Sequence, residues 1–449
     1  MPNPGEQLAA FVSGLTYEQL PETARQRVKE ITVDTLASAI AGRHGDETAQ
    51  IERLAELVTG QGDSTILGGP RRMSAGGAAL VNGYQVTAVT VCDIFRPALC
   101  HITPEVVPPA LAIAEGRGCS GADLLTAIAA GLETTTRIGF ALNYPAFRER
   151  GWHSPGVIGP FGGAAAVGSL MGLDPVSQRH AFGLAGSQAA GTFAHWGTPT
   201  IKFHQSRGSL SGLMAAVLAG EGFLSAEDIL NNPDGGLFHT YSDGGRPELV
   251  AEELGQRWDL ETIGLRRWPA ASSVQTMITG LFHLIEAHDV MPKDVAEVRV
   301  RLSPTVYRMH GSLPWTSKFS AQLSAPYLAA VVLHDRRCWL DQFLPSRFGD
   351  PELDTFARDR VVVSEDPQIE ATASVVQIEL LDGTLYEDVR STPKGDPDDP
   401  LSMDEILGKF REASDGILAD GAVEQAVDLL SELESVEDIS GLVRLLGAP

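Results

Sequence analysis

The chain has 449 residues and a formal net charge of -24, from 34 Lys and Arg against 58 Asp and Glu. This acidic balance excludes nucleic acid as a partner, because phosphate binding needs a basic surface. The length predicts two or three domains, and an apolar content of 43% is typical of a soluble globular protein.

The sequence predicts neither a membrane partner nor a secretory signal. The longest apolar stretches, such as residues 325–333, fall far short of the roughly 20 residues that a membrane span needs, and the N-terminal MPNPGEQLAAFV has no basic segment before an apolar core. No CxxC pair occurs among Cys92, Cys100, Cys119 and Cys338, which argues against zinc ribbons and iron–sulfur clusters. We therefore expect a cytoplasmic protein with reduced thiols and no bound metal.

The first 260 residues are predicted to be mostly helical. Apolar positions recur at helical spacing in residues 20–42, 48–58, 105–116, 121–140, 161–172, 178–190 and 208–222. Helix starts are indicated by Ser120, by Ser225 and by Asp174 with Pro175. The glycine-rich segments 159–168 and 183–191 are too regular for loops, and we expect central helices in close contact there. No GxGxxG follows a strand and no Walker A lysine is present, which disfavours a nucleotide cofactor.

A change of pattern near residue 264 predicts a second domain. Residues 295–304, 360–366 and 374–390 alternate like half-buried strands, and Asp382-Gly383 indicates a hairpin turn. Helical patterns at 272–287 and 321–334 lie between these strands, and helix returns at 402–448.

The predicted fold class is therefore mainly α. A large, discontinuous all-helical domain would comprise residues 1–263 plus 396–449, and a smaller α+β, lid-like domain of residues 264–395 would be inserted into it.

The segment KFHQSRGSLSGLMAAVLAGEGF, residues 202–223, places Lys202 and His204 before a run of small residues. Small residues allow two helices to approach closely, and a cationic pair at such a helix start can bind an anion. A solvated lysine ahead of a core helix is the alternative interpretation.

Three further polar residues come from breaks in the helical pattern. Asp93 lies in VTVCDIFRPALCHITP, His101 follows eight residues later, and His153 follows Gly151-Trp152. A lone buried histidine is more often a satisfied core residue than a catalyst. Three such groups beside glycine-rich helix ends favour a functional cleft.

These segments together resemble the MmgE/PrpD family, which includes 2-methylcitrate dehydratase, cis-aconitate decarboxylase and iminodisuccinate epimerase. Besides the 202–223 segment, the resemblance is carried by LPETARQRVKEITVDTLASAIAG (20–42), HITPEVVPPALAIAE (101–115), GWHSPGVIGPFGGAAAVGSLMGLD (151–174), AQLSAPYLAAVVL (321–333) and TPKGDPDDPLSMDEILGKFR (392–411). It implies a large helical domain, an inserted α+β domain, and an active site in the cleft between them.

The resemblance also implies roles for the polar residues. The family breaks a bond beside a carboxylate of a small di- or tricarboxylate, so His101 and His153 are the candidate acid and base, in either order. Lys202 would supply a fixed positive charge for the developing negative charge and would hold carboxylates together with His204. Asp93 would orient or polarise a histidine. No cofactor and no metal are implied.

In the second domain, the family element K-x-Y-P corresponds here to Arg266-Arg267-Trp268-Pro269, and Gln275 replaces a family histidine. Arginine keeps the charge and binds carboxylates bidentately, but it cannot exchange protons as lysine can. These departures favour a divergent member that acts on a small polycarboxylate other than 2-methylcitrate.

The family element A-x-F-S-x-P-Y corresponds here to AQLSAPY, with Gln322, Ser324 and Tyr327 as candidate binding residues. Capping and packing of a helix is the alternative for Ser324 and Tyr327. Tyr307 and His310 in TVYRMHG are weaker pointers to the cleft.

The leading functional hypothesis is a cofactor-independent lyase, a dehydratase or decarboxylase of a small di- or tricarboxylate. An epimerase of an aminopolycarboxylate is the close alternative, and a catalytically inactive carboxylate-binding or scaffold relative is the alternative of another class. The family resemblance and the small-residue helices also predict a homodimer.

Overall fold

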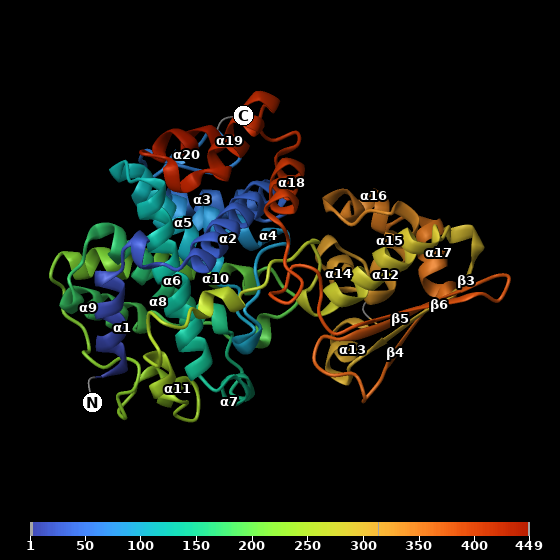
Figure 1. Cartoon of the computed structure of the whole chain (residues 1–449), viewed down its shortest axis with the longest axis horizontal. Coiled ribbons are helices and arrows are strands. Elements are labelled where there is room, and N and C mark those ends of the chain that lie inside the picture. Colours follow the sequence, from blue (N-terminus) through green and yellow to red (C-terminus); the bar gives the residue numbers. More distant parts are fainter. Residues whose placement is uncertain (1–2, 313, 448–449) are drawn as a thin grey trace. The chain divides into compact units, whose positions relative to one another are not determined.

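A computed structural model describes residues 3–312 and 314–447. The contacts between residues divide the chain into two compact units. One unit, here called the helical unit, runs to Gly264 and resumes at Ser402, and the other, the α+β unit, spans Leu265–Leu401. The predicted mainly α fold class is confirmed, since helices dominate the helical unit and contribute much of the other (Figure 1).

The helical unit contains helices from both ends of the described chain. They are α1 (Pro4–Gly14), α2 (Glu22–Ala41), α3 (Thr48–Thr59), α4 (Ala75–Ala88), α5 (Thr103–Arg117), α6 (Gly121–Ala141), α7 (Tyr144–Glu149), α8 (Ser154–Met171), α9 (Pro175–Gly186), α10 (Thr200–Gly220), α11 (Leu237–Tyr241), α18 (Met403–Ser414), α19 (Asp420–Ser431) and α20 (Ser440–Leu446). None of the described helices is long and apolar enough to cross a membrane.

Helix α8 is the central helix of this unit, in contact with α5, α6 and α10 (Figure 1). Glycines allow this close approach. A Cβ at Gly212 of α10 would lie 2.8 Å from the Cα of Gly163 in α8, and one at Gly162 would lie 2.7 Å from the carbonyl oxygen of Gly131 in α6. The prediction of a closely packed central helix at 159–168 is therefore confirmed, whereas only the start of 183–191 is helical, because α9 ends at Gly186.

Helix caps account for two of the predicted helix starts. Ser120 accepts a hydrogen bond from the backbone N–H of Asp123, and Asp174 accepts from the first turn of α9. The prediction of a helix after Ser225 was wrong. That segment forms only turns, since Pro233 and the glycines after it interrupt the chain before a helix gains length, and the Ser225 hydroxyl donates to the carbonyl of His180.

A small sheet corrects the prediction of an all-helical first domain. Strands β1 (Ser64–Thr65) and β2 (Arg72–Met73) pair antiparallel within the helical unit. Each strand has two residues, too few to produce a detectable alternation of apolar and polar positions. Both strands lie in the connection between α3 and α4.

The α+β unit consists of a four-stranded sheet with helices. Its elements are α12 (Gln275–His288), β3 (Val295–Leu302), α13 (Pro304–His310), α14 (Lys318–Leu323), α15 (Ala325–Asp335), α16 (Pro345–Phe348), α17 (Pro351–Arg360), β4 (Val361–Glu365), β5 (Ser374–Leu380) and β6 (Leu385–Arg390). The strand order is β4-β3-β5-β6, with β3 and β4 parallel and the other pairs antiparallel.

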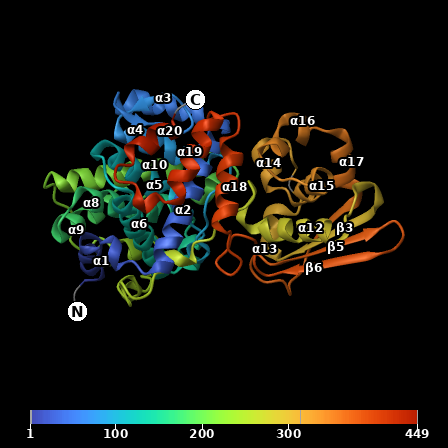
Figure 2. The ribbon, with the colours of Figure 1, turned by 45° about the horizontal axis from the view of Figure 1, so that its top comes forward.

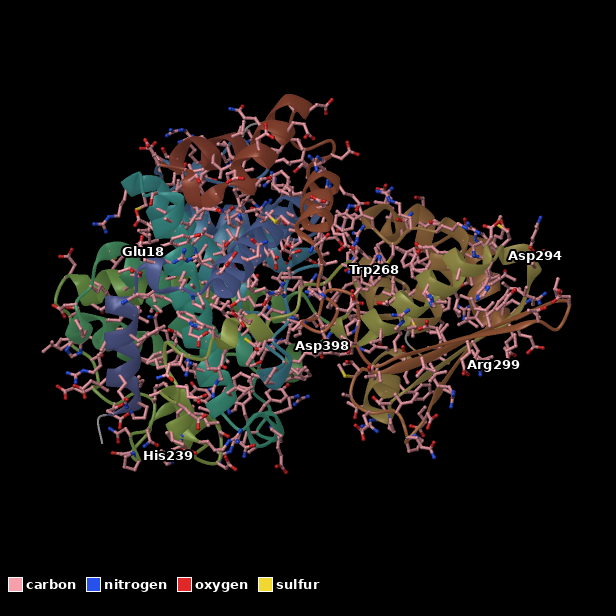
Figure 3. The ribbon with its side chains drawn as sticks, in the orientation of Figure 1. Glu18, His239, Trp268, Asp294, Arg299 and Asp398 are labelled. Atoms are coloured by element: carbon pink, nitrogen blue, oxygen red, sulfur yellow. The ribbon has the colours of Figure 1, made fainter. Side chains whose placement is uncertain are left out.

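The sheet shows the predicted alternation along β3. Val298, Val300 and Leu302 are fully buried, on the side that α12, α15 and α17 contact (Figure 2). Arg299 lies on the opposite face, where it pairs with Glu297 and, at 2.5 Å, with Glu379 (Figure 3). The predicted hairpin is also confirmed, because Gly383 takes a φ of 87° between β5 and β6.

Helix α18 returns the chain to the helical unit and packs on α2. The ammonium group of Lys409 donates to Asp34 Oδ1 at 2.6 Å and to the carbonyl of Val91 at 2.8 Å. Both side chains are buried, with 0% and 1% of Lys409 and Asp34 exposed. The C-terminal segment therefore fixes the connection between α4 and α5, which carries two of the predicted site residues.

Candidate active site

Asp93 holds the connection between α4 and α5 in place. Its carboxylate accepts hydrogen bonds from the backbone N–H of Ile102 at 2.7 Å, from the backbone N–H of Thr103 at 3.2 Å and from the Thr103 hydroxyl at 2.6 Å. The side chain is 1% exposed. A negative charge that caps the N-terminus of a helix is favourable, so Asp93 fixes the start of α5 and the backbone around it.

The ring of His101 is oriented by the backbone of Asp93. Its Nδ1 lies 2.6 Å from the Asp93 carbonyl oxygen. A carbonyl oxygen can only accept, so Nδ1 carries the hydrogen and, in the neutral ring, Nε2 carries the lone pair. This is the tautomer in which Nε2 can act as a base.

His153 and His204 form a pair across the α8–α10 contact. His153 comes directly before α8, and its Nδ1 lies 3.1 Å from Nδ1 of His204 in the first turns of α10. One nitrogen must donate and the other accept, so a single hydrogen lies between the two rings. Both histidines are buried.

The two rings are neutral at physiological pH. Burial lowers the pKa of His153 well below its usual range, and the neighbouring His204 and His101 lower it further. Burial, followed by His195 and Arg207, lowers the pKa of His204 to about 4. The Ser154 hydroxyl, next to His153, donates to the carbonyl of Leu99 at 3.1 Å, two residues before His101. The segments that carry the three predicted histidines therefore meet in the helical unit.

Lys202 is buried rather than solvated, with 7% of the residue exposed. Its ammonium group donates to the carbonyl of Ala88 at 2.5 Å, at the end of α4 and at the start of the connection that leads to Asp93. The alternative interpretation, a solvated lysine before a core helix, was therefore wrong. Lys202 lies two residues before His204 on α10, as the sequence predicted.

Two cationic residues and one further histidine of the cluster were not predicted. The ring of His195 lies 5.7 Å from that of His204. Arg207, one turn after His204, donates to the carbonyls of Gln188 and Gly156, and the guanidinium of Arg148 lies 3.5 Å above the ring of Phe193. No local pattern marks these residues, because only the tertiary contacts of three separate segments bring them to the histidines.

One trio of described residues has potential metal-ligand atoms within 4.8 Å of one another, Cys92, Asp93 and His101. The Asp93 carboxylate already accepts the three hydrogen bonds that cap α5, and Nδ1 of His101 is used by a carbonyl oxygen. This donor set fits a helix cap better than a metal centre.

The predicted site residues of the α+β unit begin with Arg266 and Arg267. Arg266 is 3% exposed and donates to the carbonyl of Ala270 at 3.3 Å. Gln275, which stands where the family has a histidine, donates to the carbonyls of Trp268 and Ala270 at 3.0 and 3.1 Å. Gln275 thus holds the 266–271 segment in place through these hydrogen bonds. The placement of either arginine opposite the histidines stays a prediction.

Gln322 and Ser324 lie next to this segment within the α+β unit. The backbone N–H of Ala271 donates to the carbonyl of Gln322, and the predicted residues Gln322 and Ser324 are both buried. His310 contacts the same part of the unit. Its Nδ1 contacts the carbonyl of Leu323 at 2.8 Å and its Nε2 contacts the Ser273 hydroxyl at 2.7 Å, and burial lowers its pKa to about 4.

Tyr327 packs inside the α+β unit. The residue is fully buried, its hydroxyl donates to the carbonyl of Gln342, and its ring lies against Phe343 and Trp315. These contacts fit the alternative interpretation of Tyr327, in which it packs a helix and binds no substrate.

Family models match both parts of the chain. The MmgE/PrpD N-terminal domain family matches residues 6–250, and the MmgE/PrpD C-terminal domain family matches residues 268–433. The chain belongs to the MmgE/PrpD family. All the clustered histidines lie in the region matched by the N-terminal domain, and Arg266 and Arg267 come directly before the region matched by the C-terminal domain.

Curated relatives of the chain cover nearly its whole length. A cis-aconitate decarboxylase-like protein of Aspergillus oryzae is 27% identical over 98% of this chain and 96% of the relative. The cis-aconitate decarboxylase of Aspergillus terreus is 26% identical over 99% of this chain and 96% of its own, and that of Homo sapiens is 26% identical over 99% and 94%.

Proposed function

We propose that this protein is a lyase that breaks a bond beside a carboxylate of a small di- or tricarboxylate, with decarboxylation of the cis-aconitate type as the favoured reaction. One observation carries the proposal. His101, His153 and His204, all in the region that the MmgE/PrpD N-terminal domain matches, form a cluster in which His153 and His204 have lowered pKa values. The names of the relatives favour decarboxylation over dehydration.

The chemistry asks two things of the site. Loss of CO₂ leaves negative charge on a carbon beside a remaining carboxylate, and fixed cations stabilise that charge. Lys202, buried at the start of α10, is the nearest such cation in sequence to the histidines. The carbon must then receive a proton, and a histidine whose pKa is lowered becomes a strong acid once it is protonated.

His101 and His153 are the candidates for that proton transfer. His101 has Nε2 as the basic nitrogen of its neutral ring, and His153 shares one hydrogen with His204. Either can take a proton from solvent or substrate and return it to carbon. Arg266 and Arg267 would bind a second carboxylate, since guanidinium groups pair with carboxylates bidentately.

The test is a substrate panel in deuterated water, followed by proton NMR and by CO₂ detection. The panel contains cis-aconitate, citrate, 2-methylcitrate and an aminopolycarboxylate. The proposal predicts CO₂ release, or release of water, from at least one di- or tricarboxylate. Exchange of a substrate hydrogen without bond cleavage would instead indicate an epimerase, and no turnover or exchange with any compound would indicate the inactive, carboxylate-binding alternative.

A further inference from the structure

Glu105 is an unused acid next to the histidine cluster. It lies in the first turn of α5 and is 0% exposed. Neither of its carboxyl oxygens has a hydrogen-bond partner in the described part of the chain. An ionised carboxylate buried without a partner is very costly, so the group must hold its proton. Neither the sequence pattern nor the proposed mechanism assigns it a role.

Two glycines make room for this carboxyl group between α8 and α10. A Cβ at Gly159 of α8 would lie 2.6 Å from Glu105 Cδ, and a Cβ at Gly208 of α10 would lie 2.9 Å from Glu105 Cγ. Any larger residue at either position would displace the acid. The acid is therefore seated in a space that both helices leave for it.

The contact between α8 and α10 that surrounds Glu105 also includes His204. Gly208 follows His204 by four residues on α10, and a Cβ at Gly156, three residues before Gly159 on α8, would lie 3.1 Å from His204 Cβ. Residues four apart lie on one face of a helix, about 5.4 Å along its axis. Glu105 is thus seated roughly one helical turn from the His153–His204 pair, a distance that one water molecule can bridge.

The surrounding charges keep the proton on Glu105. Burial raises the pKa of this carboxyl well above its usual range, and the nearby Asp93 raises it further, while Arg207 of α10 acts in the opposite direction. The Cys100 thiol, the other acidic group facing it, also has a raised pKa because of its burial. His153 and His204, with lowered pKa values, are neutral.

We propose that Glu105 is the proton store of the candidate active site, a positioning residue that acts through the His153–His204 pair. In this step the O–H bond of Glu105 breaks and a new N–H bond forms on the pair, which leaves a carboxylate and an imidazolium. The imidazolium then gives its proton to the substrate carbon, and the carboxylate regains a proton from solvent. One proton is consumed per CO₂ released, as replacement of a carboxylate by hydrogen requires. The inference rests on the proposed lyase function.

Glu105→Gln separates storage from packing. The amide has the size and neutrality of the protonated acid but cannot release a proton, so a packing role would survive and a storage role would not. We expect kcat to fall roughly 10²-fold with little change in KM, the lower end of what a positioned acid contributes. Glu105→Asp, which can still release a proton, should retain more of kcat than Glu105→Gln. Equal losses in both variants, or an unchanged kcat in Glu105→Gln, would overturn the proposal.

Glu115→Gln is the matched control on the same helix. Its carboxylate accepts from the backbone N–H and the hydroxyl of Thr65 at 2.8 and 2.6 Å, far from the histidine pair along α5. This variant removes one carboxylate from α5 without touching the proposed store. Its kcat should equal that of the unaltered protein.

Infrared spectroscopy tests the stored proton without any substrate. The C=O stretch of a protonated carboxylic acid should persist in the unaltered protein at about pH 9, where carboxyl groups of ordinary pKa are ionised and Glu133, with a pKa of about 7, is ionised too. The band should be absent from Glu105→Gln. Absence of the band in the unaltered protein would overturn the proposal even if Glu105→Gln failed to fold. A band that is present in a protein without lyase activity would refute the proposed function and leave the protonated state of Glu105 established.

Discussion

Lys409→Met removes the buried cation that ties the C-terminal segment to the rest of the helical unit. Methionine keeps an unbranched apolar chain, so packing changes little. Asp34 stays buried at 1% exposure without its ammonium partner, and breaking a buried ion pair in this way typically costs 3–5 kcal/mol. The carbonyl of Val91 loses a donor as well, so the free energy of unfolding should fall by about 4 kcal/mol.

Urea unfolding followed by circular dichroism measures this change. The double variant Asp34→Asn/Lys409→Met is the control, because it removes both buried charges and should recover most of the lost stability. A loss below about 1 kcal/mol for Lys409→Met would refute the reasoning. A double variant as unstable as the single one would refute it too.

Three further predictions concern packing, pH and assembly. Gly212→Ala should lower the free energy of unfolding by about 1–3 kcal/mol, because its Cβ would lie 2.8 Å from Gly163 Cα. The control Gly408→Ala, in an exposed helical position with open space around it, should raise the free energy of unfolding by up to about 1 kcal/mol. Equal effects of the two variants in urea unfolding would contradict the close packing of α8 and α10. His310 has a pKa lowered from 6.5 to about 4, so the unfolded chain binds a proton more readily. The stability that this residue contributes is complete above about pH 6.5 and should fall by up to about 3 kcal/mol as the pH drops toward 4, and an unaltered pH dependence in His310→Gln would contradict this. We propose a homodimer, so light scattering should give twice the chain mass of 47.8 kDa, and a constant monomer mass would refute the dimer.

Much of the fold could be predicted because its signals are local. The capping residue Ser120 and the apolar pattern after it define α6, and Asp382-Gly383 between two alternating runs defines the β5–β6 hairpin. The two-residue strands at Ser64 and Arg72 carry no such pattern. The helix predicted after Ser225 was also wrong for a local reason. A good capping residue marks where a helix can start, but it does not show how soon the chain will turn again.

The site was predictable only in part, because residue type reveals chemistry but not distance. His101, His153 and Lys202 could be chosen as polar residues at breaks between small-residue helices, with help from the family resemblance. The pairing of His153 with His204 depends on how α8 crosses α10. Glu105 was missed for the same reason, because its seat is made by glycines more than 50 residues away in sequence.

The central claim is that the histidine cluster transfers the proton to carbon. The most direct measurement compares the unaltered protein with His153→Ala and His101→Ala, turning over cis-aconitate in deuterated water, by NMR. The account predicts one deuterium at the carbon beside a remaining carboxylate, where the charge left by CO₂ is stabilised, and rates roughly 10²–10⁴-fold lower in both folded variants. Deuterium incorporation at the unaltered rate in both variants would contradict it.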